Sequence, residues 1–127
     1  MTNKNKDQLK NFIQNNAGYI RPVSEIQELI QSDHRLYWIE EQPNFNFYQE
    51  LETNCDPLVQ KHQQLQTNIR TITRPNSLEE FKTQFNADTK AEANNKAEQR
   101  IDELQKQQEQ LRKQFEIHFT NYFQQFL

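Results

Sequence analysis

The stretch FEIHFTNYFQQFL, residues 115–127, ends the chain and decides its fold. It places five aromatic side chains within thirteen positions, namely Phe115, Phe119, Tyr122, Phe123 and Phe126. Most of the steps between them are three or four residues, which puts the rings on one face of a helix. Burying four such rings at ~25 cal/mol per Å² contributes on the order of 10–15 kcal/mol before entropy. We therefore expect this face to be covered.

A long helix leads into this aromatic end. Thr89 and Glu92 have the spacing of a capping box, and no Gly or Pro follows them. These features predict one amphipathic helix within residues 87–127. Its apolar seam advances in alternating steps of four and three, as in a heptad repeat. The seam consists of Ala97, Ile101, Leu104, Gln108, Leu111, Phe115, His118 and Tyr122.

Shorter helices are predicted before this long one. Residues 1–22 form an N-terminal segment in which Leu9, Phe12 and Ile13 have helical spacing. We expect Gly18 to follow that helix in a left-handed cap. Residues 23–86 are predicted to form a helical bundle, which begins with a stripe of Val23, Ile26, Leu29 and Ile30. Isolated helices below ~12–15 residues are marginal in water, so these short helices must pack together.

Prolines and caps separate the helices of the bundle. Pro43 is expected to open one helix, and Asp56 with Pro57 is expected to cap and open the next. Ser77 and Glu80 form a capping box for a third. The helix after Pro43 is expected to hold Phe45, Tyr48 and Leu51. The predicted fold class is all-α: a small bundle of short helices followed by a long C-terminal amphipathic helix.

Composition limits the possible functions. Only 33% of the 127 residues are hydrophobic and the mean hydropathy is -1.15, yet the net charge of -3 is too small for a chain disordered by charge. One Gly and four Pro are few for a sheet protein. With Cys55 as the only cysteine and no apolar leader or membrane-length run, we expect an intracellular, non-secreted protein without a membrane partner.

Candidate catalytic and metal-binding residues are isolated from one another. His34, His62 and His118 are far apart, with no spacing that would bring two ligands onto one helix face. Nothing in the sequence points to a histidine partner for Cys55, which fits a small buried thiol. The adjacent carboxylates Glu40 and Glu41 fit a solvated face. We therefore predict no enzyme activity, no cofactor and no small-molecule substrate.

The middle of the chain resembles the homeobox-like class of three-helix domains, which includes Myb/SANT repeats. The resemblance covers about residues 37–86, with Trp38, the apolar positions after Pro43 and the helix from Ser77. It implies DNA contact through the third helix and nearby cations. The corresponding basic residues are Lys61, Arg70, Arg74 and Lys82. Departures from the pattern are Glu79 and Glu80 in the third helix and the absence of regularly spaced tryptophans.

The sequence allows two ways of burying the aromatic end of this helix. The helix folds back on the apolar faces of residues 9–39, or it inserts into a groove of another protein. We therefore predict a non-catalytic helical protein–protein interaction subunit that binds one or more protein subunits. The predicted interface is Leu104, Leu111, Phe115, Phe119, Tyr122, Phe123 and Phe126. The alternative is a homeobox-like DNA-binding accessory factor of a nuclear DNA- or chromatin-acting complex.

Overall fold

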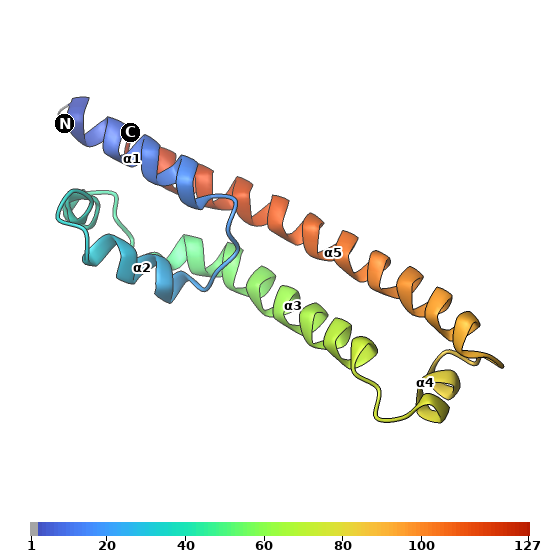
Figure 1. Ribbon diagram of the computed structural model, residues 1–127. Coiled ribbons are helices and arrows are strands. Elements are labelled where there is room, and N and C mark those ends of the chain that lie inside the picture. The colour runs from blue at the N-terminus through green and yellow to red at the C-terminus, as the bar shows by residue number, and fades with distance from the viewer. Residues whose placement is uncertain (1–2) are drawn as a thin grey trace. The chain divides into compact units, whose positions relative to one another are not determined.

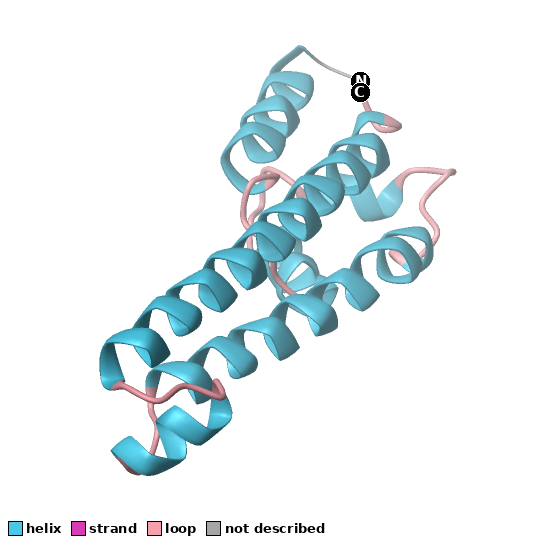
Figure 2. Ribbon diagram, turned by 90° about the vertical axis from the view of Figure 1, so that its right-hand side faces the viewer, coloured by secondary structure: helices cyan, strands magenta, loops and turns pink. Residues whose placement is uncertain are grey.

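The computed structural model describes residues 3–127, which form helices and loops and contain no strand (Figure 2). The predicted all-α class with a long C-terminal helix is confirmed. The elements are α1 (Asn3–Asn16), α2 (Val23–Gln31), the short 3-10 helix η1 (Tyr37–Glu41), α3 (Gln49–Thr73), α4 (Leu78–Gln84) and α5 (Lys90–Gln124) (Figure 1).

The chain divides into two compact units, and both divisions fall inside a helix. Unit 1 comprises the chain up to Gln60 together with Leu111–Leu127, and unit 2 comprises Lys61–Gln110. Each unit has its own apolar core.

Unit 1 covers the aromatic end of α5 with elements from the other end of the chain. Figures 1 and 2 show α1 beside the last turns of α5. The ring of Phe12 lies 5.7 Å from that of Phe119 and 5.4 Å from that of Phe123, measured between ring centroids. The buried partners from α1, α2 and η1 are Leu9, Val23, Ile26, Ile30 and Ile39. The sequence allowed the aromatic end to pack on residues 9–39 or on another protein. The structure shows the packing within the chain.

Unit 2 joins the second half of α3, α4 and the first half of α5. Its buried residues are Ile69, Ile72, Phe81, Ala93, Ala97 and Leu104. Both predicted N-caps are present: Ser77 Oγ accepts the backbone N–H of Glu80 at 3.1 Å, and Thr89 Oγ1 accepts that of Glu92 at 3.1 Å. These bonds satisfy N–H groups that have no partner within their own helix.

The polar seam position Gln108 also faces α3. Its Nε2 donates to Oε1 of Gln66 at 3.0 Å and to the carbonyl of His62 at 3.4 Å. A glutamine in the seam is tolerated here because its amide finds partners on the facing helix, which avoids an unpaired polar group.

The helix start predicted at Asp56 and Pro57 is wrong. Both residues lie inside α3, which continues through Pro57. Proline removes one backbone hydrogen bond and disfavours a helix interior. Helix α3 continues because Leu51, Cys55, Leu58 and Val59 lie in the same buried core on both sides of the proline. Asp56 instead caps a different helix, since its Oδ1 accepts the backbone N–H of Val23, the first residue of α2, at 3.1 Å.

The helix predicted after Pro43 is also wrong. Phe47 and Tyr48 have φ angles of 57° and 62°, which a right-handed helix cannot contain. Residues 42–48 form a loop, and α3 begins after it at Gln49. Gly18, by contrast, has no positive φ, so its predicted left-handed cap is absent. The chain leaves α1 through a turn in which the N–H of Tyr19 bonds to the carbonyl of Asn16 at 3.1 Å.

Candidate functional site

The predicted interface residues lie inside the protein. Exposed fractions are 0% for Phe115, Phe119 and Phe123, 2% for Phe126 and 3% for Tyr122. Leu104 is buried in the core of unit 2, and Leu111 is partly buried against the core of unit 1. The stripe is therefore not a free surface.

The loop of residues 42–48 is anchored to this buried stripe. The phenol of Tyr122 donates a hydrogen bond to Oδ1 of Asn46 at 2.9 Å. The amide Nδ2 of Asn44 donates to the backbone carbonyl of Gln125 at 3.4 Å. These bonds join positions 76 and 81 residues apart in sequence. The aromatic end of α5 thus supports a loop as well as filling a core.

The loop presents one large aromatic side chain to solvent. Phe47 is 77% exposed, whereas the next residue, Tyr48, is 2% exposed. The ring of Phe45 packs against both of these rings. Its centroid lies 5.3 Å from that of Phe47 and 4.9 Å from that of Tyr48. A bulky residue with positive φ costs of order 1–3 kcal/mol and persists only where the surroundings impose it. At Tyr48 burial offsets this strain, but at Phe47 most of the ring stays in water.

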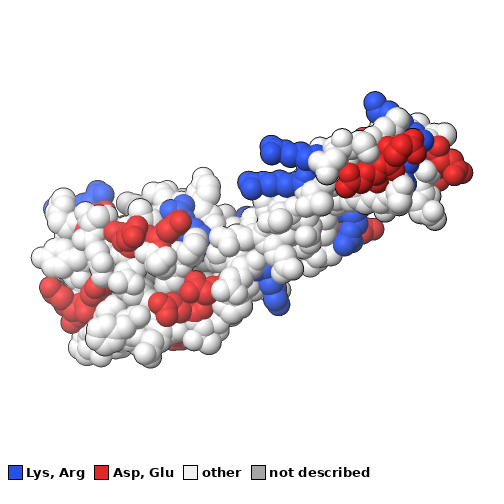
Figure 3. Space-filling model, turned by 90° about the horizontal axis from the view of Figure 1, so that it is seen from below, with Lys and Arg blue, Asp and Glu red and all other residues white. Residues whose placement is uncertain are grey.

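Carboxylates flank the loop in sequence. Glu40 accepts a hydrogen bond from the Tyr48 phenol at 2.7 Å, and Glu41, Glu50 and Glu52 are exposed. Burial, then this bond to Glu40, raises the pKa of Tyr48. Burial also raises the pKa of Tyr122 to about 12, with the charges of Glu50, Glu40 and Glu52 adding to the shift. On the face of unit 1 in Figure 3, acidic atoms gather in several groups.

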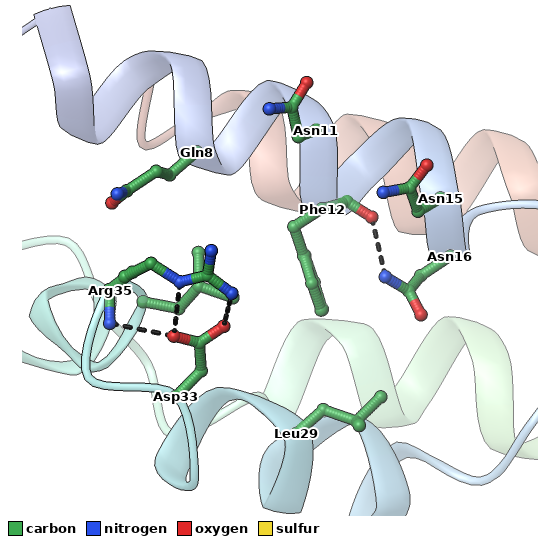
Figure 4. Close-up of a pocket in the computed structure, with 9 residues that line it drawn as sticks. Gln8, Asn11, Phe12, Asn15, Asn16, Leu29, Asp33 and Arg35 are labelled. Atoms are coloured by element: carbon green, nitrogen blue, oxygen red, sulfur yellow. Dashed lines mark hydrogen bonds and ion pairs between the residues drawn. The ribbon is translucent and has the colours of Figure 1, made fainter.

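Two hollows of unit 1 lie between α1 and the segment that follows α2. The first, of about 380 Å³, is shown in Figure 4, where amide side chains of α1 stand across from an ion pair between Arg35 and Asp33. Arg35 Nε and Nη2 each lie 3.0 Å from an oxygen of Asp33. This pairing lowers the pKa of Asp33, mainly through the hydrogen bond from the guanidinium.

The second hollow has a different lining. It measures about 450 Å³ and shares Gln8 and Arg35 with the first. Its other described lining residues are Lys4, Asn5, His34, Tyr37 and Trp38, so aromatic rings and cations line it and no acidic side chain does. We call it the basic–aromatic hollow.

The basic residues expected to touch DNA all belong to unit 2. Lys61 and Arg70 are exposed on α3, and Arg74 is exposed in the link after it. Lys82 on α4 is only partly exposed, and its Nζ lies 3.1 Å from Oε1 of Glu79. That ion pair reduces the positive charge of the helix that the homeobox-like resemblance assigns to the major groove.

Potentially reactive side chains are scattered. Burial raises the pKa of the Cys55 thiol to about 12, so its reactive thiolate is scarce at neutral pH. Burial lowers the pKa of His62. Within residues 3–127, no group of three or more His, Cys, Asp or Glu side chains could hold a metal ion. None of the helices in the described chain is both long and apolar enough to cross a membrane.

Sequence reasoning missed both the exposed loop and the hollow. The loop carried a signal, because Pro43, Asn44 and Asn46 are turn-forming residues clustered within four positions. The apolar spacing of Phe45, Tyr48 and Leu51 imitates a helix and hides it. The hollow had no local signal, since Lys4 on α1 meets Tyr37 and Trp38 only after folding.

Comparison with protein-family models, curated proteins and solved structures finds no significant match for this chain.

Proposed function

We propose that this protein is a non-catalytic helical interaction subunit of a multiprotein assembly and that the loop of residues 42–48 is its contact. The observation that carries the proposal is Phe47, whose ring is 77% exposed on a backbone with φ of 57°. Strained backbone and exposed aromatic rings both reduce the stability of an isolated protein. Their occurrence together on a well-anchored loop favours a binding role, in which a partner desolvates the ring.

The loop has the properties of a preorganised anchor. Tyr122, Asn46 and the ring of Phe45 hold it in place, so little loop ordering is required on binding. Aromatic anchors surrounded by polar rims dominate the energy of protein interfaces. The buried stripe of α5, which the sequence predicted as the interface, would then act indirectly by supporting this loop.

Capture experiments test the proposal. The purified chain, immobilised through a tag, is exposed to extract of its native source, in parallel with the variants Phe47→Ala and Leu78→Ala. Leu78 is a matched control, being 47% exposed and located in unit 2. We expect Phe47→Ala to lose the captured proteins and Leu78→Ala to retain them, with circular dichroism unchanged. Equal capture by both variants would exclude the loop as the contact.

A further inference from the structure

The exposed loop and the basic–aromatic hollow are complementary in chemistry. The loop offers a phenyl ring with Glu41, Glu50 and Glu52 beside it in the sequence, all exposed. The hollow offers aromatic side chains with cations around them and no acidic lining residue among those described. Carboxylates close in sequence to an exposed aromatic ring thus complement a hollow lined by aromatic rings and by Lys4.

We propose that the partner of the loop is a second copy of this chain, whose basic–aromatic hollow receives Phe47. This inference rests on the proposed function, because it names the partner of the same loop. A cavity of about 150 Å³ is enough for a benzene ring. The hollow is open to solvent and measures about 450 Å³, a volume larger than that of a phenyl ring.

The side chains around the hollow fit this occupant in detail. Tyr37 is 50% exposed and, with Trp38, offers ring faces and edges to an entering phenyl group. Lys4 lies at the hollow, and in the proposed dimer its ammonium group faces the carboxylates that accompany Phe47. Arg35 contributes less charge, because Asp33 already pairs with its guanidinium at 3.0 Å.

The placement of the two features allows a closed dimer. Both belong to unit 1, and η1 carries Tyr37 and Trp38 at one end and leads directly into the loop. In the proposed dimer a two-fold axis relates the two copies, and the Phe47 of each copy enters the hollow of the other. Such isologous pairing is the commonest symmetry of soluble oligomers, and it leaves neither Phe47 nor the basic–aromatic hollow of either copy unoccupied.

Charge reversal supplies a sharp test in the full-length chain. In Glu50→Lys, the positive charge introduced beside the loop repels the hollow of a second copy of the same variant. In Lys4→Glu, the hollow repels the carboxylates beside the loop of a second copy. Each variant alone should show a dimer dissociation constant on the order of tenfold to hundredfold higher than that of the unmodified chain. Mixing the two variants creates a heterodimer with one reversed ion pair and one native contact, so association should return. Glu98→Lys, on the exposed face of α5 in unit 2, is the charge control.

Sedimentation velocity and light scattering over a broad dilution series measure this association. Trp38 fluorescence gives an independent readout, because the only tryptophan of the chain lines the hollow. We expect a concentration-dependent dimer that Phe47→Ala weakens and that the mixed charge variants restore. Circular dichroism establishes that each variant is folded.

Three results would overturn the inference. A chain that stays monomeric at every concentration rules out the dimer. A dimer unaffected by Phe47→Ala uses another surface, and a mixture that fails to restore association removes the role of Lys4 and Glu50. A monomer that still captures a different protein through Phe47 would end this inference but leave the proposed function standing. A chain that neither forms a dimer nor captures another protein through Phe47 would rule out both this inference and the proposed function.

Discussion

The phenol of Tyr122 donates a hydrogen bond of 2.9 Å to Oδ1 of Asn46, and this bond connects the last turns of α5 to the loop that carries Phe47. Tyr122 is 3% exposed, so the bond forms at the edge of the core, where water competes little. Through this pair, the buried aromatic end of α5 is linked to the loop whose Phe47 ring is 77% exposed.

Tyr122→Phe should loosen the loop without unfolding unit 1. The substitution keeps the ring in the core but leaves Asn46 without its donor, which should lower the free energy of unfolding by about 1 kcal/mol. Urea denaturation followed by Trp38 fluorescence measures the change. Hydrogen exchange should increase at residues 42–48 more than in α1. A variant as stable and as protected as the unmodified chain would show that the bond does not hold the loop.

Phe119→Ala should severely destabilise unit 1. Phe119 is 0% exposed and packs against Phe12, Phe115 and Phe123. Removing a fully buried phenyl ring costs about 3–5 kcal/mol, a large part of typical domain stability. Ile117→Ala is the matched control two residues away, because Ile117 is 59% exposed. Its effect on thermal unfolding should stay within about 0.5 kcal/mol. Similar losses in both variants would contradict the packing described.

Phe47→Asn should stabilise the isolated chain while removing its binding. Asparagine tolerates positive φ better than phenylalanine does. We expect the free energy of unfolding to rise by about 0.5–1 kcal/mol, because part of the strain of 1–3 kcal/mol is relieved. Thermal unfolding in dilute solution measures this, alongside dimer formation. A clear loss of stability would mean that the Phe45 contact contributes more than the strain costs.

High pH should destabilise unit 1 through its tyrosines. An unfolded tyrosine titrates near pH 10, whereas burial raises the pKa of Tyr122 to about 12 and also raises that of Tyr48. The unfolded state therefore releases protons first, so stability is fully present below pH 10 and declines as the pH rises toward 12. Urea midpoints at a series of pH values measure the decline. Tyr122→Phe should flatten the profile, and an unchanged slope would exclude this tyrosine as its source.

DNA binding should be absent or non-specific. Lys82 is paired with Glu79, and the remaining candidates Lys61, Arg70 and Arg74 share unit 2 with several carboxylates. We expect no gel shift at micromolar protein and low salt. A shift that weakens steeply with salt and disappears in the double variant Arg70→Ala with Lys82→Ala would favour the homeobox-like alternative.

Local chemistry in the sequence determined the helical class, the caps at Ser77 and Thr89, and the buried seam of α5. These features depend on neighbours within four residues, so spacing and residue type were enough to predict them. Only the tertiary structure decided what covers the aromatic end. An apolar face within the chain and an apolar groove of another protein would bury the same rings in the same way, so the sequence did not distinguish them.

Tertiary packing also overrode local signals. Asp56 and Pro57 have the pattern of a helix start, yet burial on both sides of the proline keeps α3 continuous, and the carboxylate of Asp56 caps α2 instead. Phe45 and Tyr48 have helical spacing with Leu51, yet Tyr122 and Asn46 hold residues 42–48 in a loop that leaves the ring of Phe47 in solvent. Contacts across 33 and 76 residues of sequence decided both outcomes, and no local pattern contains them.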